Sequence, residues 1–213
     1  MKVALIAGCT GLIGKHLLDL LLDDPEYHQV KAITRRPLEI SNPKLETIIA
    51  DYHSLNDQAT HLSADDVFCC LGTTIKVAKT KEAFEEVDFH YPLLLAKLSK
   101  AQGAKQYLLV SALGADVNSS IFYNQVKGKV EQAIIEEKFS ATHIFRPSLL
   151  LGDRKEERPG EEAAKFFYKY AGFLIPKKYK GIDAAKVARS MIHFAREEKP
   201  GVHIDESAAM QSF

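Results

Sequence analysis

Residues 3–14 read VALIAGCTGLIG, a short apolar run that passes directly into a turn with glycines at Gly8, Gly11 and Gly14. A helical pattern begins at once, because leucine and isoleucine then recur at helical spacing as far as Leu22. This order of strand, G-x-x-G-x-x-G turn and helix is the context in which such a turn binds a dinucleotide. Glycines let the turn fold tightly, and backbone N–H groups can then reach a pyrophosphate at the positive end of the helix. The alternative is a tight turn without a ligand, but its place at the first strand of an α/β chain favours nucleotide binding.

Short apolar runs alternate with longer helical stretches along the rest of the chain, which is typical of a parallel sheet covered on both faces. The pattern predicts strands at Val3–Ala7, Gln29–Thr34, Thr47–Ala50, Val67–Leu71, Gln106–Val110, Thr142–Phe145 and Val202–Ile204. It predicts helices at Leu12–Leu22, Lys81–Gln102 with a break near Pro92, Asn124–Lys138, Ala163–Ala171 and Ala184–Arg196, and an exposed loop at Arg154–Glu162.

These elements predict an α/β fold, a doubly wound, Rossmann-like parallel sheet, in a single domain of residues 1–213. Residues 1–151 form the cofactor-binding core. Residues 152–213 are expected to be mostly a small C-terminal substrate lobe and closing elements, beyond the carboxyl edge of the sheet, where open α/β sheets bind their ligands.

The composition excludes several classes of protein. The 28 basic residues cancel the 28 acidic ones, which argues against a nucleic-acid binder that works through a strong positive field. No apolar run approaches the ~20 residues that span a bilayer, so we expect no membrane partner. The three cysteines, Cys9, Cys69 and Cys70, form no paired framework, and the chain has no Cys/His spacing typical of zinc. We therefore predict no metal, reduced thiols and a cytoplasmic location.

The end of the second predicted strand bears on the choice of cofactor. An acidic residue about 20 positions after the glycine turn would hold the ribose hydroxyls of NAD. This chain instead carries Arg35 and Arg36, with Arg35 21 positions after Gly14. A guanidinium donates parallel hydrogen bonds to phosphate oxygens and therefore suits the 2′-phosphate of NADP. The alternative is a pair of solvated arginines before a proline, so NADP(H) is preferred and NAD(H) is possible.

Three polar residues after the fifth predicted strand can carry chemistry. Ser111 follows this strand directly, and Tyr123 and Lys127 lie four residues apart, which places them on one face of a helix. A nearby ammonium stabilises a phenolate, so the pair can exchange a proton with a substrate. Ser111 can donate a hydrogen bond to a substrate carbonyl oxygen that becomes an oxyanion. Either helix residue alone is more often part of an exposed pair, so the prediction depends on the combination.

This combination resembles the short-chain dehydrogenase/reductase superfamily, whose pattern is a glycine turn, a Ser and then Tyr-x-x-x-Lys. The stretches Cys70–Thr74, Val110–Asp116 and Arg146–Gly152 resemble its atypical group that contains the Tat-interacting oxidoreductase homologues. The resemblance implies a Rossmann fold that binds NADP(H), with Ser111, Tyr123 and Lys127 as the catalytic positions.

The same resemblance implies which residues contact the cofactor. They are Gly8, Thr10, Gly11, Leu12, Ile13 and Gly14 in the turn, Arg35 and Arg36, Asp51 and Tyr52 near the adenine, Leu71, Gly72 and Thr73 on the ribose side, Lys127, and Pro147, Ser148, Leu149 and Leu150 past the nicotinamide.

Two positions depart from the pattern of these relatives. Asp88 lies in the stretch where many of them carry an Asn that passes protons to solvent. Cys9 stands in the turn where Ala or Ser is commoner. A thiol at a helix N-terminus can be reactive, but a small side chain that packs in the turn explains Cys9 equally well.

The sequence therefore predicts an NADP(H)-dependent oxidoreductase that reduces a carbonyl or oxidises an alcohol on a small-molecule substrate. The alternative is a regulatory or scaffold protein that binds NADP(H) without turnover. A homodimer and a monomer are both compatible with the sequence.

Overall fold

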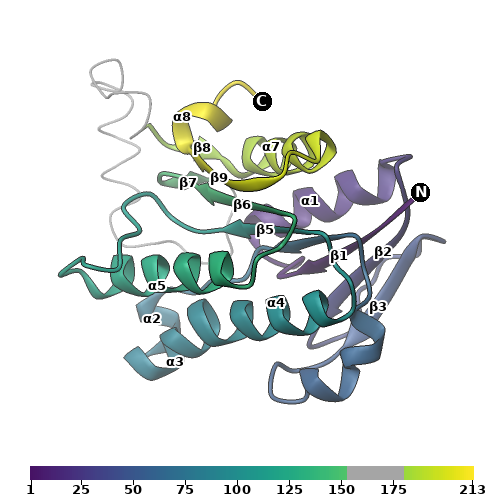
Figure 1. The fold of residues 1–213 in the computed structure, drawn as a ribbon, viewed down its shortest axis with the longest axis horizontal. Coiled ribbons are helices and arrows are strands. Elements are labelled where there is room, and N and C mark those ends of the chain that lie inside the picture. Colours follow the sequence, from purple (N-terminus) through teal and green to yellow (C-terminus); the bar gives the residue numbers. More distant parts are fainter. Residues whose placement is uncertain (153–179) are drawn as a thin grey trace.

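The computed structural model describes residues 1–152 and 180–213. The predicted loop at Arg154–Glu162 and the predicted helix at Ala163–Ala171 lie outside the described residues. The described chain forms a sheet of seven parallel strands with helices on both faces (Figure 1). The strand order is β3-β2-β1-β4-β5-β6-β9, which confirms the predicted doubly wound, Rossmann-like fold. The strands are β1 (Lys2–Ala7), β2 (Tyr27–Thr34), β3 (Leu45–Ile49), β4 (Asp66–Cys69), β5 (Gln106–Val110), β6 (Ala141–Arg146) and β9 (Gly201–Glu206).

Each of the seven predicted strands has a counterpart in this sheet, with bounds that shift by a few residues. Two further strands, β7 (Leu150–Leu151) and β8 (Ile182–Asp183), pair with each other outside the main sheet, and were not predicted because two residues carry no periodic signal. The helices are α1 (Leu12–Asp23), the 3₁₀ helix η1 (Leu55–Leu62), α2 (Ile75–Ala78), α3 (Lys81–Glu85), the π-helix η2 (Glu86–His90), α4 (Tyr91–Ala101), α5 (Phe122–Glu136), α7 (Ala184–Glu197) and α8 (Ser207–Met210).

The core lies in two layers, one on each face of the sheet. Helices α1 and α7 cover one face, and α4 and α5 cover the other (Figure 1). Leu17, Leu21 and Met191 are fully buried in the first layer. Leu95 and Ile134 are fully buried in the second. This double cover is why the inner strands β4 and β5 are buried along their whole length, whereas the edge strands β3 and β9 also carry exposed residues.

The C-terminal part of the described chain closes the Rossmann sheet. Strand β9 pairs in parallel with β6, and α7 packs against α1 (Figure 1). Helix α7 begins after Asp183, whose side chain accepts a hydrogen bond from the N–H of Ala185 at 2.8 Å, as an N-cap does. Residues 182–213 therefore supply closing elements of the sheet. The predicted substrate lobe stays a prediction, because residues 153–179 lie outside the described residues.

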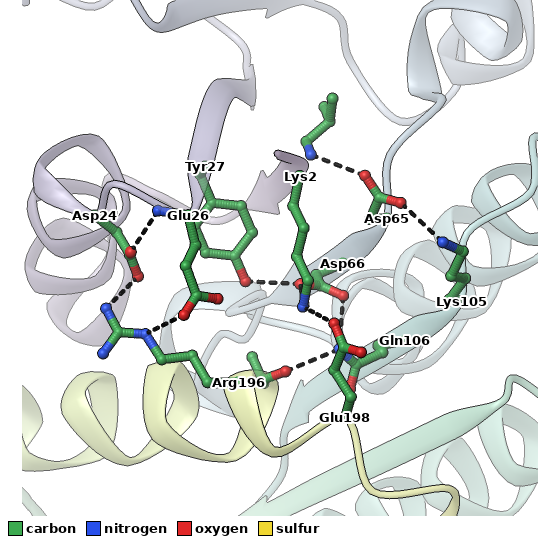
Figure 2. Close-up of polar contacts among 12 residues, drawn as sticks. Lys2, Asp24, Glu26, Tyr27, Asp65, Asp66, Lys105, Gln106, Arg196 and Glu198 are labelled. Atoms are coloured by element: carbon green, nitrogen blue, oxygen red, sulfur yellow. Dashed lines mark hydrogen bonds and ion pairs between the residues drawn. The ribbon is translucent and has the colours of Figure 1, made fainter.

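A buried polar cluster joins the amino ends of four strands. Its members Lys2, Tyr27, Asp66 and Gln106 are the first residues of β1, β2, β4 and β5 (Figure 2). The Asp66 carboxylate accepts hydrogen bonds from the Tyr27 hydroxyl at 2.7 Å, from Lys2 at 3.2 Å and from the Gln106 amide at 2.7 Å. Burial and the charge of Asp66 raise the pKa of Tyr27, so this hydroxyl keeps its proton. The cluster stabilises the amino edge of the sheet. The glycine turn lies at the opposite edge, where the carboxyl ends of the strands are.

The predicted helix at Lys81–Gln102 forms as three consecutive segments. Five residues at Glu86–His90 adopt π-helical geometry between α3 and α4. The break that was predicted near Pro92 is therefore this π-helical segment, which ends two residues before the proline. Pro92 itself occupies the first turn of α4, where a missing N–H costs little. π-turns often occur at functional sites, and this one buries Asp88 against the carboxyl edge of the sheet.

Candidate functional site

The glycine turn joins β1 to α1 at the carboxyl edge of the sheet. Gly8 has a φ of +83°, and a Cβ there would lie 2.6 Å from the backbone oxygen of Cys70. A Cβ on Gly14 would lie 2.1 Å from the backbone oxygen of Gly8. Gly11 has a φ of −77° and leaves the N-terminus of α1 without a side-chain cap. The positive φ in the turn therefore belongs to Gly8, and the N–H groups in the first turn of α1 make a cradle for an anion.

A cavity of about 460 Å³ opens from this cradle. Many of the residues predicted for catalysis or cofactor binding line this cavity. They are Thr10, Gly11, Leu12, Ile13, Leu71, Gly72, Thr73, Ser111, Tyr123, Lys127 and Leu150. It is also lined by residues that were not predicted to contact the cofactor, namely Lys15, Cys70, Thr74, Val77, Asp88 and Val110. Asp88 had a signal in the sequence, because it occupies the stretch where relatives carry the relay Asn. The others lie next to predicted residues in the chain or one helical turn away.

Lys127 and Asp88 form a buried ion pair in this cavity. The Lys127 Nζ lies 2.7 Å from the Asp88 Oδ1, and both side chains are 5% exposed or less. The other Asp88 oxygen accepts a hydrogen bond from the N–H of Thr73 at 2.8 Å. Burial, the largest single influence, would lower the pKa of Lys127, but the charge of Asp88, the hydrogen bond to Asp88 and the interaction with Tyr123 together outweigh it and raise this pKa above its usual 10.5. Lys127 therefore carries its charge into the cavity with a fixed position.

Ser111 is hydrogen-bonded to a residue that sequence reasoning did not single out. Its hydroxyl donates to the Oε1 of Glu131, which is buried on α5 one turn after Lys127. Arg146, at the end of β6, binds the same carboxylate through Nε at 3.0 Å and through Nη2. The hydrogen bond from Arg146 to Glu131 raises the pKa of the guanidinium further. In the described state the Ser111 proton is directed at Glu131, whereas we had expected it to be directed at a substrate oxygen.

Tyr123 stands at the start of α5, half-buried at the wall of the cavity. Its ring packs against the buried ring of Phe84, with 5.5 Å between the centroids. Tyr123, Lys127 and Glu131 follow one another at four-residue spacing along one stripe of α5. The prediction that Tyr123 and Lys127 share a helix face is confirmed.

The predicted adenine end lies at the carboxyl ends of β2 and β3, outside the wall of this cavity. Asp51 accepts hydrogen bonds from the backbone N–H and the hydroxyl of Ser54, which lower the pKa of its carboxyl. Tyr52 stacks on Tyr91 with 4.5 Å between the ring centroids. Burial raises the pKa of Tyr52, while the positive charge of nearby Arg35 acts against this rise. Arg35 is exposed, as its predicted phosphate contact requires.

Of the predicted residues past the nicotinamide, Leu150 lines the cavity, whereas Pro147, Ser148 and Leu149 do not. Pro147 accepts a hydrogen bond from the N–H of Leu113, and Leu149 accepts one from the N–H of Ile182. Ser148 contacts the hydroxyl of Ser207 at 2.9 Å. Gly8, Gly14, Arg36, Asp51 and Tyr52 also lie outside the cavity wall, so their predicted contacts stay predictions.

The remaining sequence-based hypotheses concern the thiols, metals and membranes. Burial raises the pKa of Cys9 to about 11, which favours packing over reactivity for this thiol. Within residues 1–152 and 180–213, no group of three or more His, Cys, Asp or Glu side chains is arranged to hold a metal ion. Among the described helices none is long and apolar enough to cross a membrane.

The fold and the site together define a dinucleotide-binding α/β protein with Ser, Tyr and Lys at the carboxyl edge of its sheet. The chain belongs to the NAD(P)H-binding family, whose model matches residues 8–151. Protein HTATIP2 of Rattus norvegicus is 40% identical over 171 residues, which cover 78% of this chain and 70% of that protein. Protein FMP52, mitochondrial, of Eremothecium gossypii is 32% identical over 216 residues, which cover 98% of this chain and 96% of that protein. The expected resemblance to the Tat-interacting group is confirmed.

Solved structures support the same fold. MoeE5 in complex with UDP-glucose and NAD superposes with a TM-score of 0.72 at 16% identity, covering 94% of this chain and 74% of that one. The Bordetella bronchiseptica enzyme WbmH in complex with NAD+ superposes with a TM-score of 0.71 at 17% identity, covering 97% of this chain and 76% of that one. At such low identity these likenesses establish the Rossmann fold.

Proposed function

We propose that this protein is an NADP(H)-dependent oxidoreductase of the short-chain type, which interconverts a carbonyl and an alcohol on a small molecule. One observation carries the proposal: Ser111, Tyr123 and Lys127 all line the cavity that opens from the uncapped N-terminus of α1. The glycine cradle fits a pyrophosphate, because a side chain at Gly8 or Gly14 would collide with backbone. When bound, the nicotinamide supplies or accepts the hydride.

The residues of the chain supply the proton and hold the reactants. Tyr123 gives a proton from its hydroxyl to the substrate oxygen during reduction and takes it back during oxidation. Lys127, held by Asp88, contributes positive charge at the ribose side of the cavity. This charge stabilises the phenolate that forms when Tyr123 has given up its proton. Arg35 and Arg36 bind the 2′-phosphate, which is why NADP(H) is preferred over NAD(H) in this proposal.

Substitution of the phenol tests this function. Purified protein is screened for NADPH oxidation with activated carbonyl compounds such as dicarbonyls, and the best substrate is then used with Tyr123→Phe. We expect turnover to fall by about 10²–10⁴ while NADPH affinity changes little, because the phenol acts mainly in the transition state. Tyr91→Phe is the matched control, since Tyr91 is also half-buried but lies outside this cavity. Full activity of Tyr123→Phe would contradict the assignment.

The second candidate is a regulator that binds NADP(H) without turnover. The observation that favours it is that Ser111 and Lys127 both engage buried carboxylates in the described state. Tight NADPH binding with no turnover of any carbonyl or alcohol in the screen would support this alternative. A cytoplasmic location is also part of the proposal. The fungal relatives are named mitochondrial, so a mitochondrial location is the alternative, and fractionation of cells would distinguish the two.

A further inference from the structure

Strand β9 forms one edge of the seven-stranded sheet, and within the described chain no strand pairs with its outer side (Figure 1). A lysine, a proline or a bulge commonly keeps such an edge from pairing with another chain. The six residues of β9 include neither Lys nor Pro, and they pair with β6 residue for residue without a shift of register. Val202 and Ile204 on this strand are each 47% exposed. The edge is therefore open to a further strand and carries exposed apolar side chains.

The backbone of β9 restricts how a further strand can pair with it. The N–H of Gly201 donates to the carbonyl oxygen of Ser140 at 2.9 Å, so the odd-numbered residues of β9 direct their N–H and C=O groups toward β6. The even-numbered residues Val202, Ile204 and Glu206 direct theirs to the open side. In an antiparallel pair, each hydrogen-bonded position joins two residues that both face the other strand. Even-numbered residues of β9 must therefore lie opposite outward-facing residues of the added strand.

The side chains of β9 differ on its two faces. The ring of His203 stacks on His143 with 4.8 Å between the centroids, and the Oδ2 of Asp205 lies 3.5 Å from the Nδ1 of His143. His143 in turn stacks on Phe194 of α7, so His203 and Asp205 lie on the α7 face of the sheet. The two exposed aliphatic side chains lie on the opposite face, because successive residues of a strand alternate. One face of β9 is thus polar and the other apolar.

We infer that β9 is a dimerisation strand, which pairs antiparallel with β9 of a second copy of this chain about a two-fold axis at Ile204. In this register Ile204 lies opposite Ile204 of the partner subunit, and Val202 lies diagonal to it, so the aliphatic side chains of both copies form one strip. On the other face His203 lies opposite Asp205 of the partner subunit, and the symmetry repeats this pair.

The alternative register that the backbone permits is centred on His203. It would place the two His203 rings opposite each other and leave Glu206 without a partner residue, so it loses both histidine–carboxylate pairs. The strand is therefore complementary to itself in charge and in apolar surface when it is centred on Ile204. This self-complementarity favours a second copy over a strand from another protein as the occupant of the edge.

This dimer goes beyond the proposed function and does not depend on it. A pair of six-residue strands buries less than the roughly 1,200–2,000 Å² of a standard interface. We therefore expect a dissociating dimer, with a Kd on the order of 10–100 µM.

Sedimentation at about 5 to 500 µM protein measures the association. The wild type should be monomeric at the lowest concentration and mostly dimeric at the highest. Ile204→Lys should stay monomeric throughout, because two ammonium groups would meet at the two-fold axis. Ile49→Lys is the matched control and should associate like the wild type, since Ile49 is a 55% exposed isoleucine on β3, at the opposite edge of the sheet. Circular dichroism confirms that each variant is folded.

Cysteine cross-linking tests the register and does not depend on the lysine variant. Ile204→Cys should give a disulfide-linked dimer under mild oxidation, because hydrogen-bonded antiparallel positions place their Cα atoms about 5.5 Å apart. Val202→Cys should not, because the two copies of that position would lie about 15 Å apart. The wild type, treated in the same way, controls for Cys9, Cys69 and Cys70.

Four results would overturn the inference. They are a wild type that is monomeric at about 500 µM, association that survives Ile204→Lys, loss of association in a folded Ile49→Lys, and cross-linking through Val202→Cys as efficient as through Ile204→Cys. If Ile204→Lys does not fold, the two cysteine variants decide. The oxidoreductase proposal is tested separately by turnover of NADPH, so either can fail without the other.

Discussion

The ion pair between Asp88 and Lys127 allows a quantitative prediction about stability. At 2.7 Å and an effective dielectric constant of ~20, the attraction between the two charges is about 6 kcal/mol. Much of it offsets the cost of removing both groups from water. In Asp88→Ala this attraction is lost and the Lys127 ammonium stays buried, so we expect the free energy of unfolding to fall by about 3–5 kcal/mol. For a chain of this size the melting temperature should fall by about 10 °C.

Chemical denaturation of four proteins measures the effect: the wild type, Asp88→Ala, Lys127→Met and the double variant. We expect the double variant to be more stable than the sum of the single losses predicts, by at least about 2 kcal/mol, because it leaves no unpaired charge. The control is Glu85→Ala, which breaks the half-exposed pair of Glu85 with Lys129 at 3.8 Å. Such surface pairs contribute about 0–1 kcal/mol.

The pH dependence follows from the raised pKa of Lys127. The stability that the pair contributes is fully present below the unfolded value of about 10.5 and is lost as pH rises through the higher folded value. The gap between wild type and Asp88→Ala should therefore be largest near neutral pH. It should narrow as pH rises, first because burial without Asp88 lowers the pKa of Lys127 in the variant, and then because the wild-type pair is lost above about pH 10. An Asp88→Ala loss no larger than that of Glu85→Ala, or additive single variants, would refute this reasoning.

Three further predictions concern the cofactor, the glycine turn and the polar cluster. Arg35→Ala should weaken NADPH binding about ten- to hundredfold and NADH binding hardly at all, and calorimetric titration that shows equal losses would contradict the role of Arg35. Gly8→Ala should lower the melting temperature more than Gly103→Ala, because both have positive φ but only the Gly8 Cβ meets backbone within 4 Å. Tyr27→Phe should cost about 1.5–3 kcal/mol of unfolding free energy, since Asp66 loses a charge-assisted hydrogen bond, and a denaturation curve equal to that of the wild type would contradict this.

Local patterns in the sequence determined the class of fold and the start of the site. The apolar runs placed all seven strands of the sheet. The signal was strongest for the inner strands β4 and β5, which are short and buried on both faces. The glycine turn placed the cradle before α1, although its position of positive φ is Gly8. Tyr123 and Lys127 could be placed together because four residues on a helix bring side chains to one face.

The tertiary structure alone decided which partners these side chains have. Lys127 meets Asp88 from a different helix, and Ser111 meets Glu131, 20 residues further along the chain. Glu131 is in turn bound by Arg146 from the end of β6. Helical spacing relates residues within one element, whereas these contacts arise where the ends of β5 and β6 come to lie beside α5 and η2. Such partners come from distant parts of the chain, so the amino-acid types could suggest Ser111 as a candidate site residue but could not identify Glu131 as the acceptor of its proton.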